Sequence, residues 1–158
     1  MHVLYSSTAF EEKYTYTGND LGAIWTPEKT IFRLWAPTAE DVTINLYRSG
    51  MPHADDLLTQ VHMTKDVNGN WIAERVGDLN GIYYTYLVHV DGQIVEACDP
   101  YAKTTGVNGE RAMVIDMDST NPVGWEDDVD PNAHLGFTDA FLYELHVRDL
   151  SMHRSSRI

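Results

Sequence analysis

The chain has 158 residues, of which 43% are hydrophobic and 22% charged, a composition typical of one globular domain or of one domain with part of another. Eleven lysines and arginines oppose 24 aspartates and glutamates, so the net charge is −13. A surface this acidic repels phosphate backbones and anionic lipid, so we expect no nucleic acid and no membrane among the partners. It suits neutral ligands such as sugars, although acidity alone does not select them.

Cysteine usage and the absence of long apolar runs predict a cytoplasmic protein. Cys98 is the only cysteine, so no internal disulfide forms and nothing indicates an oxidising compartment. No cation is next to it in sequence, so we interpret it as a small side chain at a strand end rather than a reactive thiol. No apolar run approaches the roughly 20 residues of a membrane span, and the N-terminus lacks the pattern of a secretion signal.

Residues 1–27 are expected to form an irregular N-terminal arm. Residues 18–20 are turn-forming, and Gly22 adds a second flexible point. Within the arm we predict one short strand, at 14–17. The aromatic side chains of the arm need a surface to pack on, either the following domain or a partner. They are Tyr5, Phe10, Tyr14, Tyr16 and Trp25.

Residues 30–47 contain two runs rich in β-branched and aromatic residues, which predict a hairpin of two strands. In the second run apolar side chains alternate with others, the pattern of a strand with one solvated face. The apolar set is Val42, Ile44 and Leu46, and the alternating set is Thr43, Asn45 and Tyr47. Pro37, between the runs, has no N–H to give to a sheet, so the ladder is expected to break there.

Further short strands are predicted up to residue 117. The expected ranges are 60–63, 71–76, 82–90, 93–97 and 112–117. The range 82–90 has bulky side chains on both faces and is expected at the centre of a sheet. Asn-Gly and Asp-Gly pairs at 68–69, 91–92 and 108–109 predict tight turns. Short strands with turns about every eight to twelve residues predict an all-β, antiparallel sandwich.

Two acidic stretches imitate metal sites. Asp66–Asn70 has the alternating oxygens of a calcium loop, but Trp71 takes the place of the required glycine and Gly77 that of the bidentate glutamate. The cluster 126–130 belongs to residues 118–139, which contain two prolines and two glycines. We interpret the first stretch as a hairpin turn and the second as part of a solvated linker, and we expect no metal.

The range 141–148 has the pattern of a strand, with no later strand for it to pair with. It therefore has the pattern of the first strand of a second domain. Glu144 is the only acid at the centre of an apolar strand pattern, and we interpret it as a structural hydrogen-bond partner. Glycoside hydrolysis needs two carboxyl groups held across a cleft, and most carboxylates here lie in turns or in the linker. We expect no catalytic residue and no cofactor in this chain.

Three stretches together resemble the N-terminal region of type I pullulanases, starch-debranching enzymes of the α-amylase superfamily (glycoside hydrolase family 13). The first is Phe32–Ala39, Phe-Arg-Leu-Trp-Ala-Pro-Thr-Ala. The second is Asp99–Lys103 (Asp-Pro-Tyr-Ala-Lys), followed by Val107–Arg111 (Val-Asn-Gly-Glu-Arg) and Val114–Asp116. The third is Tyr143–Asp149, Tyr-Glu-Leu-His-Val-Arg-Asp. Residues 18–22, Gly-Asn-Asp-Leu-Gly, also look like the segment before the sandwich in these enzymes.

The resemblance implies a domain order for the chain. Residues 28–117 would form an immunoglobulin-like carbohydrate-binding module of family 48, after the arm at 1–27. A linker at 118–139 would lead to 140–158, the start of a truncated (β/α)8 catalytic barrel. The parent enzyme would hydrolyse α-1,6 links in pullulan and dextrins by the retaining two-carboxylate route, with its catalytic residues beyond residue 158.

Sugar-binding members of this module family present two tryptophans and a lysine to the glucan. In this sequence, Ile94 stands where one tryptophan is expected, and Tyr86 and Leu87 stand where the lysine is expected. The platform is therefore interpreted as degenerate. The candidate carbohydrate-binding residues that remain are Trp35, Trp71, Tyr84 and Tyr86, although burial in the core or in a domain interface is the favoured interpretation of the two tryptophans.

Two hypotheses follow. The preferred one is a non-catalytic module that docks on and supports its own catalytic barrel, with self-association through 141–148 as a further expectation. The alternative is a working module that binds α-glucan or maltooligosaccharide. A freestanding glucan sensor is the third interpretation, and the linker and barrel-like strand argue against it.

Overall fold

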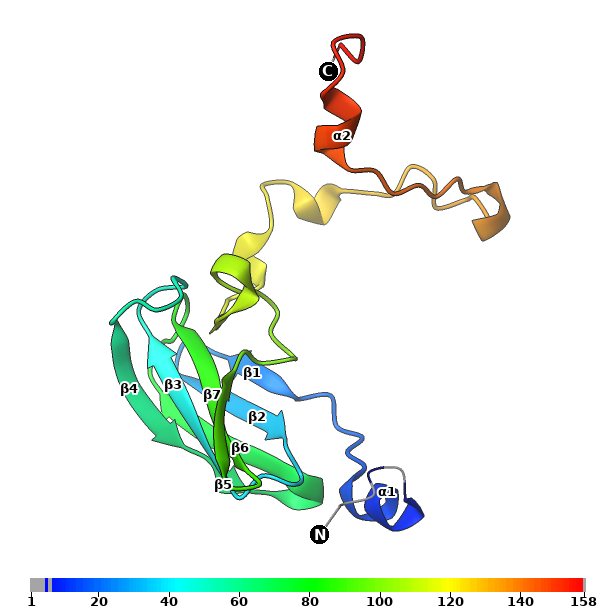
Figure 1. The fold of residues 1–158 in the computed structure, drawn as a ribbon. Helices are drawn as coiled ribbons and strands as arrows, with labels where there is room; N and C mark the ends of the chain where they lie inside the picture. The colour runs from blue at the N-terminus through cyan, green and yellow to red at the C-terminus, as the bar shows by residue number, and fades with distance from the viewer. Residues whose placement is uncertain (1–4, 6, 158) are drawn as a thin grey trace. The chain divides into compact units, whose positions relative to one another are not determined.

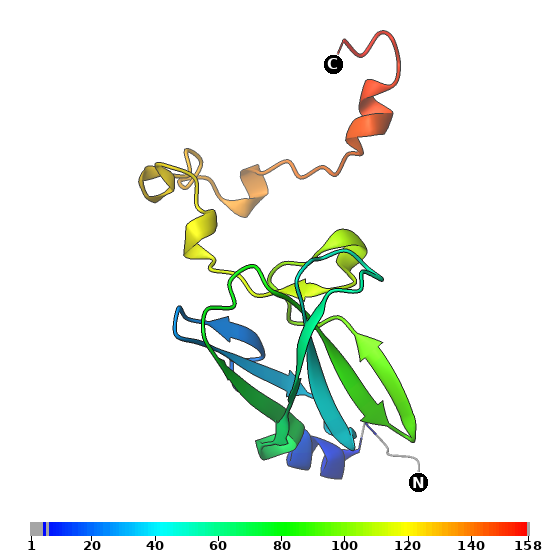
Figure 2. The same ribbon diagram turned by 90° about the vertical axis from the view of Figure 1, so that its left-hand side faces the viewer.

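The computed structural model describes residues 5 and 7–157, and the part of the arm prediction that concerns residues 1–4 and 6 lies outside them. The chain divides into two units, Met1–Thr120 and Asn121–Ile158. The first unit contains two antiparallel sheets that face each other as a β-sandwich (Figures 1 and 2). The prediction of an all-β, immunoglobulin-like sandwich is confirmed.

The first sheet has the strand order β1-β2-β6-β5, and the second has the order β4-β3-β7-β8, with β9 also paired to β7. The strands of the first sheet are β1 (Gly22–Trp25), β2 (Lys29–Trp35), β6 (Asn70–Val76) and β5 (Thr64–Lys65). Those of the second are β4 (Leu57–His62), β3 (Asp41–Tyr47), β7 (Tyr83–Val90), β8 (Gln93–Ala97) and β9 (Ala112–Met113). The prediction that the 82–90 strand is central is confirmed, because β7 pairs with β3, β8 and β9.

The helices are short. The α-helices are α1 (Thr8–Tyr14) and α2 (Val147–Ser151). The 3-10 helices are η1 (Val67–Gly69), η2 (Val107–Gly109), η3 (Asp118–Thr120), η4 (Trp125–Asp127) and η5 (Phe137–Asp139). No helix of the described residues is long and apolar enough to cross a membrane.

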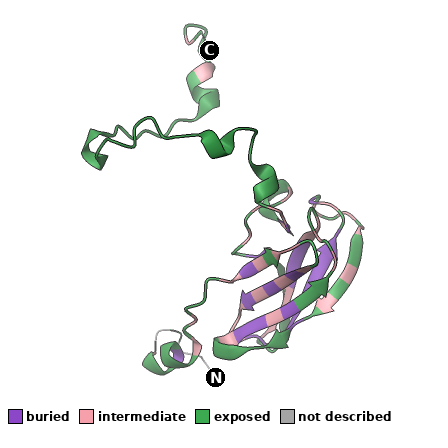
Figure 3. Ribbon diagram, turned by 180° about the vertical axis from the view of Figure 1, so that it is seen from behind, coloured by how far each residue is buried: buried purple, intermediate pink, exposed green. Residues whose placement is uncertain are grey.

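The core lies between the two sheets, and in β2 buried and half-buried residues alternate (Figure 3). In β2 the inward residues Phe32 and Leu34 are 0% and 5% exposed, and each contributes roughly 2 kcal/mol by burial. The ring of Phe32 meets Tyr84 of the opposite sheet edge-on, with 5.1 Å between centroids. This contact joins the sheets at the centre of the sandwich.

The predicted hairpin of residues 30–47 is wrong, although both strands exist. β2 pairs with β1 and β6, whereas β3 pairs with β4 and β7, so the two strands lie in opposite sheets. The backbone turns after Trp35, where the N–H of Ala39 bonds to the carbonyl of Ala36 around Pro37. Because both strands have an apolar face, placing them in opposite sheets buries both faces against each other.

The irregular arm is also a partial error, because it contains α1 and β1 and has no strand at 14–17. Ser7 caps α1 by accepting the N–H of Phe10 at 3.2 Å. Phe10 is 9% exposed and packs edge-on against Trp35, 6.5 Å between centroids. The sandwich is thus the packing surface for Phe10, whereas Tyr5 stays 61% exposed.

The three tight turns are confirmed by backbone angles that L-residues rarely adopt. Asn68, Asp91 and Asn108 have φ of 54°, 51° and 56°, and each is followed by a glycine with positive φ. Asparagine, aspartate and glycine tolerate this region best. The predicted strands at 60–63 and 112–117 are shifted or shortened, to β4 and β9.

The second unit contains no strand among its described residues, so the strand expected at 141–148 is wrong for this chain. Residues 141–146 have no regular structure, and α2 begins at Val147, with the His146 ring accepting the N–H of Asp149. The side chains of Phe141, Leu142 and Tyr143 are 97%, 96% and 81% exposed. A segment with the pattern of a strand forms a strand only when its backbone N–H and C=O groups can bond to a neighbouring strand. No such neighbour is present among the described residues, so these groups are left to bond to water.

Candidate functional site

The most developed surface feature is the outer face of the second sheet, the side chains of β3, β4, β7 and β8 that point away from the core. The register sets Asn45 opposite both Gln60 and Thr85, and Leu87 opposite Glu96. Directly paired residues of antiparallel strands project to the same side. The outer face therefore combines polar groups that are far apart in the sequence. It comprises Thr43, Asn45, Tyr47, Gln60, His62, Tyr83, Thr85, Leu87, His89, Ile94 and Glu96.

A single carboxylate organises this face. One oxygen of Glu96, Oε1, accepts hydrogen bonds from Tyr47 Oη at 2.5 Å, Thr85 Oγ1 at 2.5 Å and Asn45 Nδ2 at 3.1 Å. Gln60 Nε2 donates in turn to Asn45 Oδ1 at 2.8 Å. Burial raises the pKa of Glu96, but the bonds from Thr85, Tyr47 and Asn45 outweigh it, so the pKa lies below the usual value. The carboxylate is thus held ionised.

This network overturns the expectation that β3 has one solvated face. Thr43, Asn45 and Tyr47 are 7%, 4% and 8% exposed, almost as buried as the apolar set of the same strand. Their polar atoms are satisfied within the protein, by His62 for Thr43 and by the Glu96 network for the other two. The alternation of residues in β3 correctly assigned its side chains to two faces. It did not show that the polar face is covered by neighbouring side chains.

Arg111 holds the β3–β4 loop in place beside this face. Its guanidinium lies 3.6 Å from the ring centroid of Tyr47, and Nη1 donates to Ser49 O and to Asp56 Oδ1, both at 2.8 Å. Hydrogen bonds from Ser49 and then Arg111 lower the pKa of Asp56, which stays ionised. A Cβ added at Gly50 would lie 2.7 Å from the Cα of Gly106, so the loop and the η2 turn touch at glycines.

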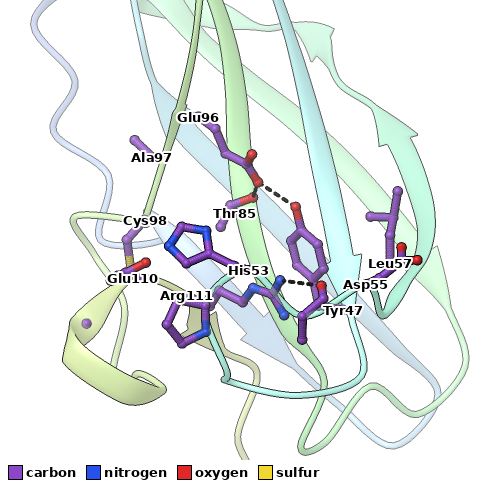
Figure 4. A pocket seen from close by; sticks show the side chains of 13 residues that line it. Tyr47, His53, Asp55, Leu57, Thr85, Glu96, Ala97, Cys98, Glu110 and Arg111 are labelled. Carbon is purple, nitrogen blue, oxygen red and sulfur yellow. Dashed lines mark hydrogen bonds between the residues drawn. The ribbon is translucent and has the colours of Figure 1, made fainter.

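A pocket of about 740 Å³ opens beside this network, between β8, the β3–β4 loop and the η2 turn (Figure 4). This size is within the range of small-ligand sites. Charged groups converge on it, and the only six-membered ring in its wall is the buried Tyr47. Its lining residues are Tyr47, Pro52, His53, Ala54, Asp55, Leu57, Thr85, Glu96, Ala97, Cys98, Gly109, Glu110 and Arg111. The pocket offers hydrogen bonds, and the exposed flat ring in its wall is the imidazole of His53.

Of the residues that the resemblance sets at platform positions, Ile94 and Leu87 lie on the outer face, whereas Tyr86 is in the core. Ile94 pairs with His89 and is 63% exposed, and Leu87 pairs with Glu96 and is half-buried. An aliphatic side chain at these positions has no planar face to cover a sugar ring and no hydrogen-bond donor. The face therefore keeps a pocket but lacks both aromatic stacking and a lysine at these positions.

The four candidate carbohydrate-binding residues do not gather at this pocket. Tyr84 and Tyr86 are each 1% exposed in the core, where Tyr84 Oη donates to Asp99 Oδ2 at 2.7 Å. Trp71 is 3% exposed, with its Nε1 bonded to Ala36 O. Trp35 is half-buried beneath α1 and donates to Tyr14 O at 2.8 Å. Burial of the first three rings leaves no ring face open to a sugar, as the favoured interpretation of Trp71 expected.

Sequence reasoning missed Tyr47, Glu96 and Arg111. Each stands in a strand or turn that was predicted, but single-strand patterns do not show that they meet across three elements. The Val-Asn-Gly-Glu-Arg stretch was the only signal that touched this region. Among residues 5 and 7–157, no group of three or more histidine, cysteine or acidic side chains is placed to hold a metal ion.

The fold and this face define an immunoglobulin-like β-sandwich module with a polar pocket on one sheet. Residues 20–102 match the family described as carbohydrate-binding module 48 (isoamylase N-terminal domain). The match covers just over half of the chain, and the chain belongs to this family.

Its relatives are pullulanases. The chain is 35% identical over 150 residues to pullulanase 1, chloroplastic, of Arabidopsis thaliana, with 89% of the chain and 15% of the relative covered. It is 32% identical over 150 residues to the pullulanase of Bacillus subtilis (strain 168), with 95% and 19% covered. The chain thus spans less than a fifth of the length of these curated relatives.

Solved structures agree. A mutant pullulanase of Paenibacillus barengoltzii complexed with maltotriose is 45% identical with a TM-score of 0.85, covering 96% of this chain and 23% of that one. The pullulanase of Anoxybacillus sp. LM18-11 complexed with maltotetraose is 38% identical with a TM-score of 0.79, covering 94% and 21%. The resemblance to pullulanases seen in the sequence is confirmed.

Proposed function

We propose that the chain is the non-catalytic N-terminal module of a pullulanase, an enzyme that hydrolyses α-1,6 links in starch-like glucans, and that it mainly docks on and supports the catalytic barrel. The family match and the pullulanase relatives support this assignment. The relatives are five to seven times longer than the matched region, which leaves room in them for a catalytic domain.

The observation that favours docking over glucan capture is the outer face. Leu87 and Ile94, which the resemblance sets at platform positions, are aliphatic and lie on this face, and the ring of Tyr47 is covered by Arg111. An exposed aromatic face can replace the water on the apolar side of a sugar ring and so strengthen binding. This face supplies hydrogen bonds alone, which contribute little net affinity in competition with water.

The exposed segment at 141–146 supports the same proposal. Phe141, Leu142 and Tyr143 form a run of nearly fully exposed large side chains, the pattern of a surface that is covered in an assembly. In the docking proposal the barrel covers it. A second copy of the chain can cover it as well, so self-association of this chain through 141–148 is part of the proposal.

The alternative function is α-glucan binding at the outer-face pocket. It is favoured by the family, by the size of the pocket and by the ionised Glu96, whose second oxygen is not used by the network. A carboxylate oxygen can accept a hydrogen bond from a sugar hydroxyl. Maltooligosaccharide in this pocket would need no stacking platform.

Titration with maltoheptaose, followed by backbone NMR shifts, separates the two functions. The docking proposal expects no saturable shifts at Leu87, Ile94 or Glu96 up to 1 mM ligand, which corresponds to about 4 kcal/mol of binding free energy. Saturable shifts at these residues that disappear in Glu96→Gln, with Glu74→Gln on the other sheet as the control, would establish the glucan-binding alternative.

A further inference from the structure

The tripeptide Val-Asn-Gly occurs twice in the chain, at Val67–Gly69 and at Val107–Gly109, and each copy forms a short 3-10 turn, η1 and η2. The backbones of the two turns are closely similar. The angles φ and ψ are 54° and 33° at Asn68, and 56° and 15° at Asn108. The glycines that follow have φ of 77° and 72°. The two copies therefore share residues and local conformation, and they differ in the contacts that the rest of the sandwich makes with them.

An asparagine followed by glycine is prone to spontaneous deamidation. The glycine nitrogen attacks the side-chain carbonyl carbon, Cγ, of the asparagine, and the new N–Cγ bond closes a five-membered succinimide. The Cγ–Nδ2 bond breaks, and Nδ2 leaves as ammonia with the proton of the glycine nitrogen. Water then opens the ring at either carbonyl and leaves aspartate or isoaspartate. Glycine favours the attack because it has no Cβ beside the nitrogen, and a folded protein slows the attack by holding both groups in place.

Asn68 is held by the sandwich. Its Nδ2 donates to Lys13 O at 3.3 Å, and its carbonyl oxygen accepts from Trp35 Nε1 at 3.2 Å. A Cβ added at Gly69 would lie 2.7 Å from the Cα of Pro37, so the glycine is packed against the chain. The leaving amide and the attacking nitrogen of this copy are both confined.

Asn108 occupies the same position of its turn but is exposed. Gly109 is exposed as well, and a Cβ added there would meet nothing within 4 Å. In the part of the chain that the structure describes, the side chain of Asn108 forms no hydrogen bond. The Gly109 N–H donates to Gly106 O at 3.2 Å, the upper end of the usual range. The tip of this turn is therefore free to open.

A further Asn-Gly pair, Asn80-Gly81, is restrained like the first. The Gly81 N–H donates to Val114 O at 2.8 Å, and Asn80 Oδ1 accepts from the N–H of Asp116 at 3.0 Å. The attacking nitrogen and the side chain of this pair are thus both bonded to a distant segment of the chain.

The η2 turn is joined to the outer-face pocket on both sides of the exposed pair. The Val107 N–H donates to Gly50 O at 3.0 Å, and the Gly106 N–H donates to Arg111 O at 2.8 Å. Glu110 and Arg111, which follow the turn, line the pocket (Figure 4). Isoaspartate in the turn would lengthen the backbone by one methylene, and either product would add a negative charge beside Glu110.

We propose that Asn108 is a site of spontaneous deamidation, through a succinimide with Gly109, and that the fold protects Asn68 and Asn80. Conversion of Asn108 loosens the β3–β4 loop, because the altered turn no longer fits against Gly50. The co-reactant is water, and the inference depends on neither docking nor glucan binding.

Mass spectrometry of the whole chain, incubated folded at mildly alkaline pH and then digested with trypsin, tests the proposal. Cleavage after lysine and arginine places Asn68 in peptide 66–75 and Asn108 in peptide 104–111. In the folded chain Asn108 should convert about tenfold faster than Asn68, because opening η1 must break the hydrogen bonds that hold Asn68. In urea, where these contacts are lost, the two copies should convert at rates within about twofold of each other.

Two variants separate the effect of the fold from that of the local sequence. Trp35→Phe removes the indole donor to Asn68 O, and it should speed conversion at Asn68 while leaving that at Asn108 unchanged. Asn108→Gln should abolish conversion in peptide 104–111, because the longer side chain closes the cyclic intermediate far more slowly. The urea midpoint of each variant shows that it is folded.

Hydrogen exchange measures the effect on the pocket. Residues 49–56 should exchange faster in the incubated chain than in the fresh chain, and incubated Asn108→Gln should match its own fresh sample. Three results would overturn the proposal. They are equal conversion of Asn68 and Asn108 in the folded chain, a difference between them that persists in urea, and unchanged exchange at 49–56 once Asn108 has converted.

Discussion

Asp99 is the buried carboxylate on which the two core tyrosines converge. It is 4% exposed and accepts hydrogen bonds from Tyr84 Oη at 2.7 Å, from Tyr86 Oη at 3.4 Å and from the N–H of Tyr101 at 2.8 Å. Burial raises its pKa, and these bonds offset that effect only in part. The same burial raises the pKa of both tyrosines, so their hydroxyls remain donors.

The unfolding free energy of the Asp99→Asn variant should depend less on pH than that of the unsubstituted chain. Because the folded pKa is above the unfolded value of 3.8, Asp99 contributes stability that is fully present below pH 3.8 and is lost as the pH rises through the folded value. The unfolding free energy of the unsubstituted chain, relative to Asp99→Asn, should therefore fall as the pH rises above 3.8. Urea titrations measure this, and a difference that stays constant with pH would contradict it.

Arg111 is predicted to be the costliest polar side chain to remove. It is 6% exposed and bonds to Ser49 O and Asp56 while covering Tyr47. Arg111→Ala should lower the unfolding free energy by about 3 kcal/mol, because it leaves buried partners unpaired. Arg111→Lys should restore only part of this loss, since an ammonium cannot form the same planar fork.

Arg75→Ala, an exposed arginine of β6, is the matched control and should change the unfolding free energy by less than about 0.5 kcal/mol. Urea unfolding measures all three variants. Equal costs for Arg111→Ala and Arg75→Ala would show that the loop is not held by this contact.

At the level of elements, α1 is fastened to the sandwich mainly through Phe10, which contacts Trp35. Phe10→Ala should lower the free energy of local opening of α1 by about 2 kcal/mol, the value of one buried aromatic side chain. Hydrogen exchange should become faster in residues 8–14 while β2 and β7 keep their protection. Glu12→Ala, exposed on the same helix, should change neither. Equal acceleration across the sandwich would mean that α1 is part of the global core.

Local patterns predicted the strands and turns of the sandwich because both depend on neighbours in the sequence. Alternation located β3 and β7, and the Asn-Gly and Asp-Gly pairs located three turns with positive φ. The assignment of β2 and β3 to opposite sheets depends on partners about 40 residues away, which no local pattern contains. α1 was missed although Ser7 is a favourable N-cap residue and Glu11 adds an acidic side chain in the first turn.

At the level of the whole molecule, the site was less predictable than the fold. That Ile94, and Tyr86 or Leu87, replace the platform residues stays a prediction from the resemblance, and pairing places Leu87 and Ile94 on the outer face. Glu96 and Arg111 acquire their roles only when β3, β7, β8 and the η2 turn come together. The cytoplasmic location stays a prediction from cysteine usage.

Docking on a catalytic barrel is the central claim, and the thermal midpoint of a pullulanase tests it most directly. In the Bacillus subtilis relative, the matched segment would be deleted in one variant and replaced by this chain in another. The account predicts that deletion lowers the midpoint of the remaining protein and that replacement restores most of it. A deletion variant that unfolds at the same temperature as the intact enzyme would contradict the docking role.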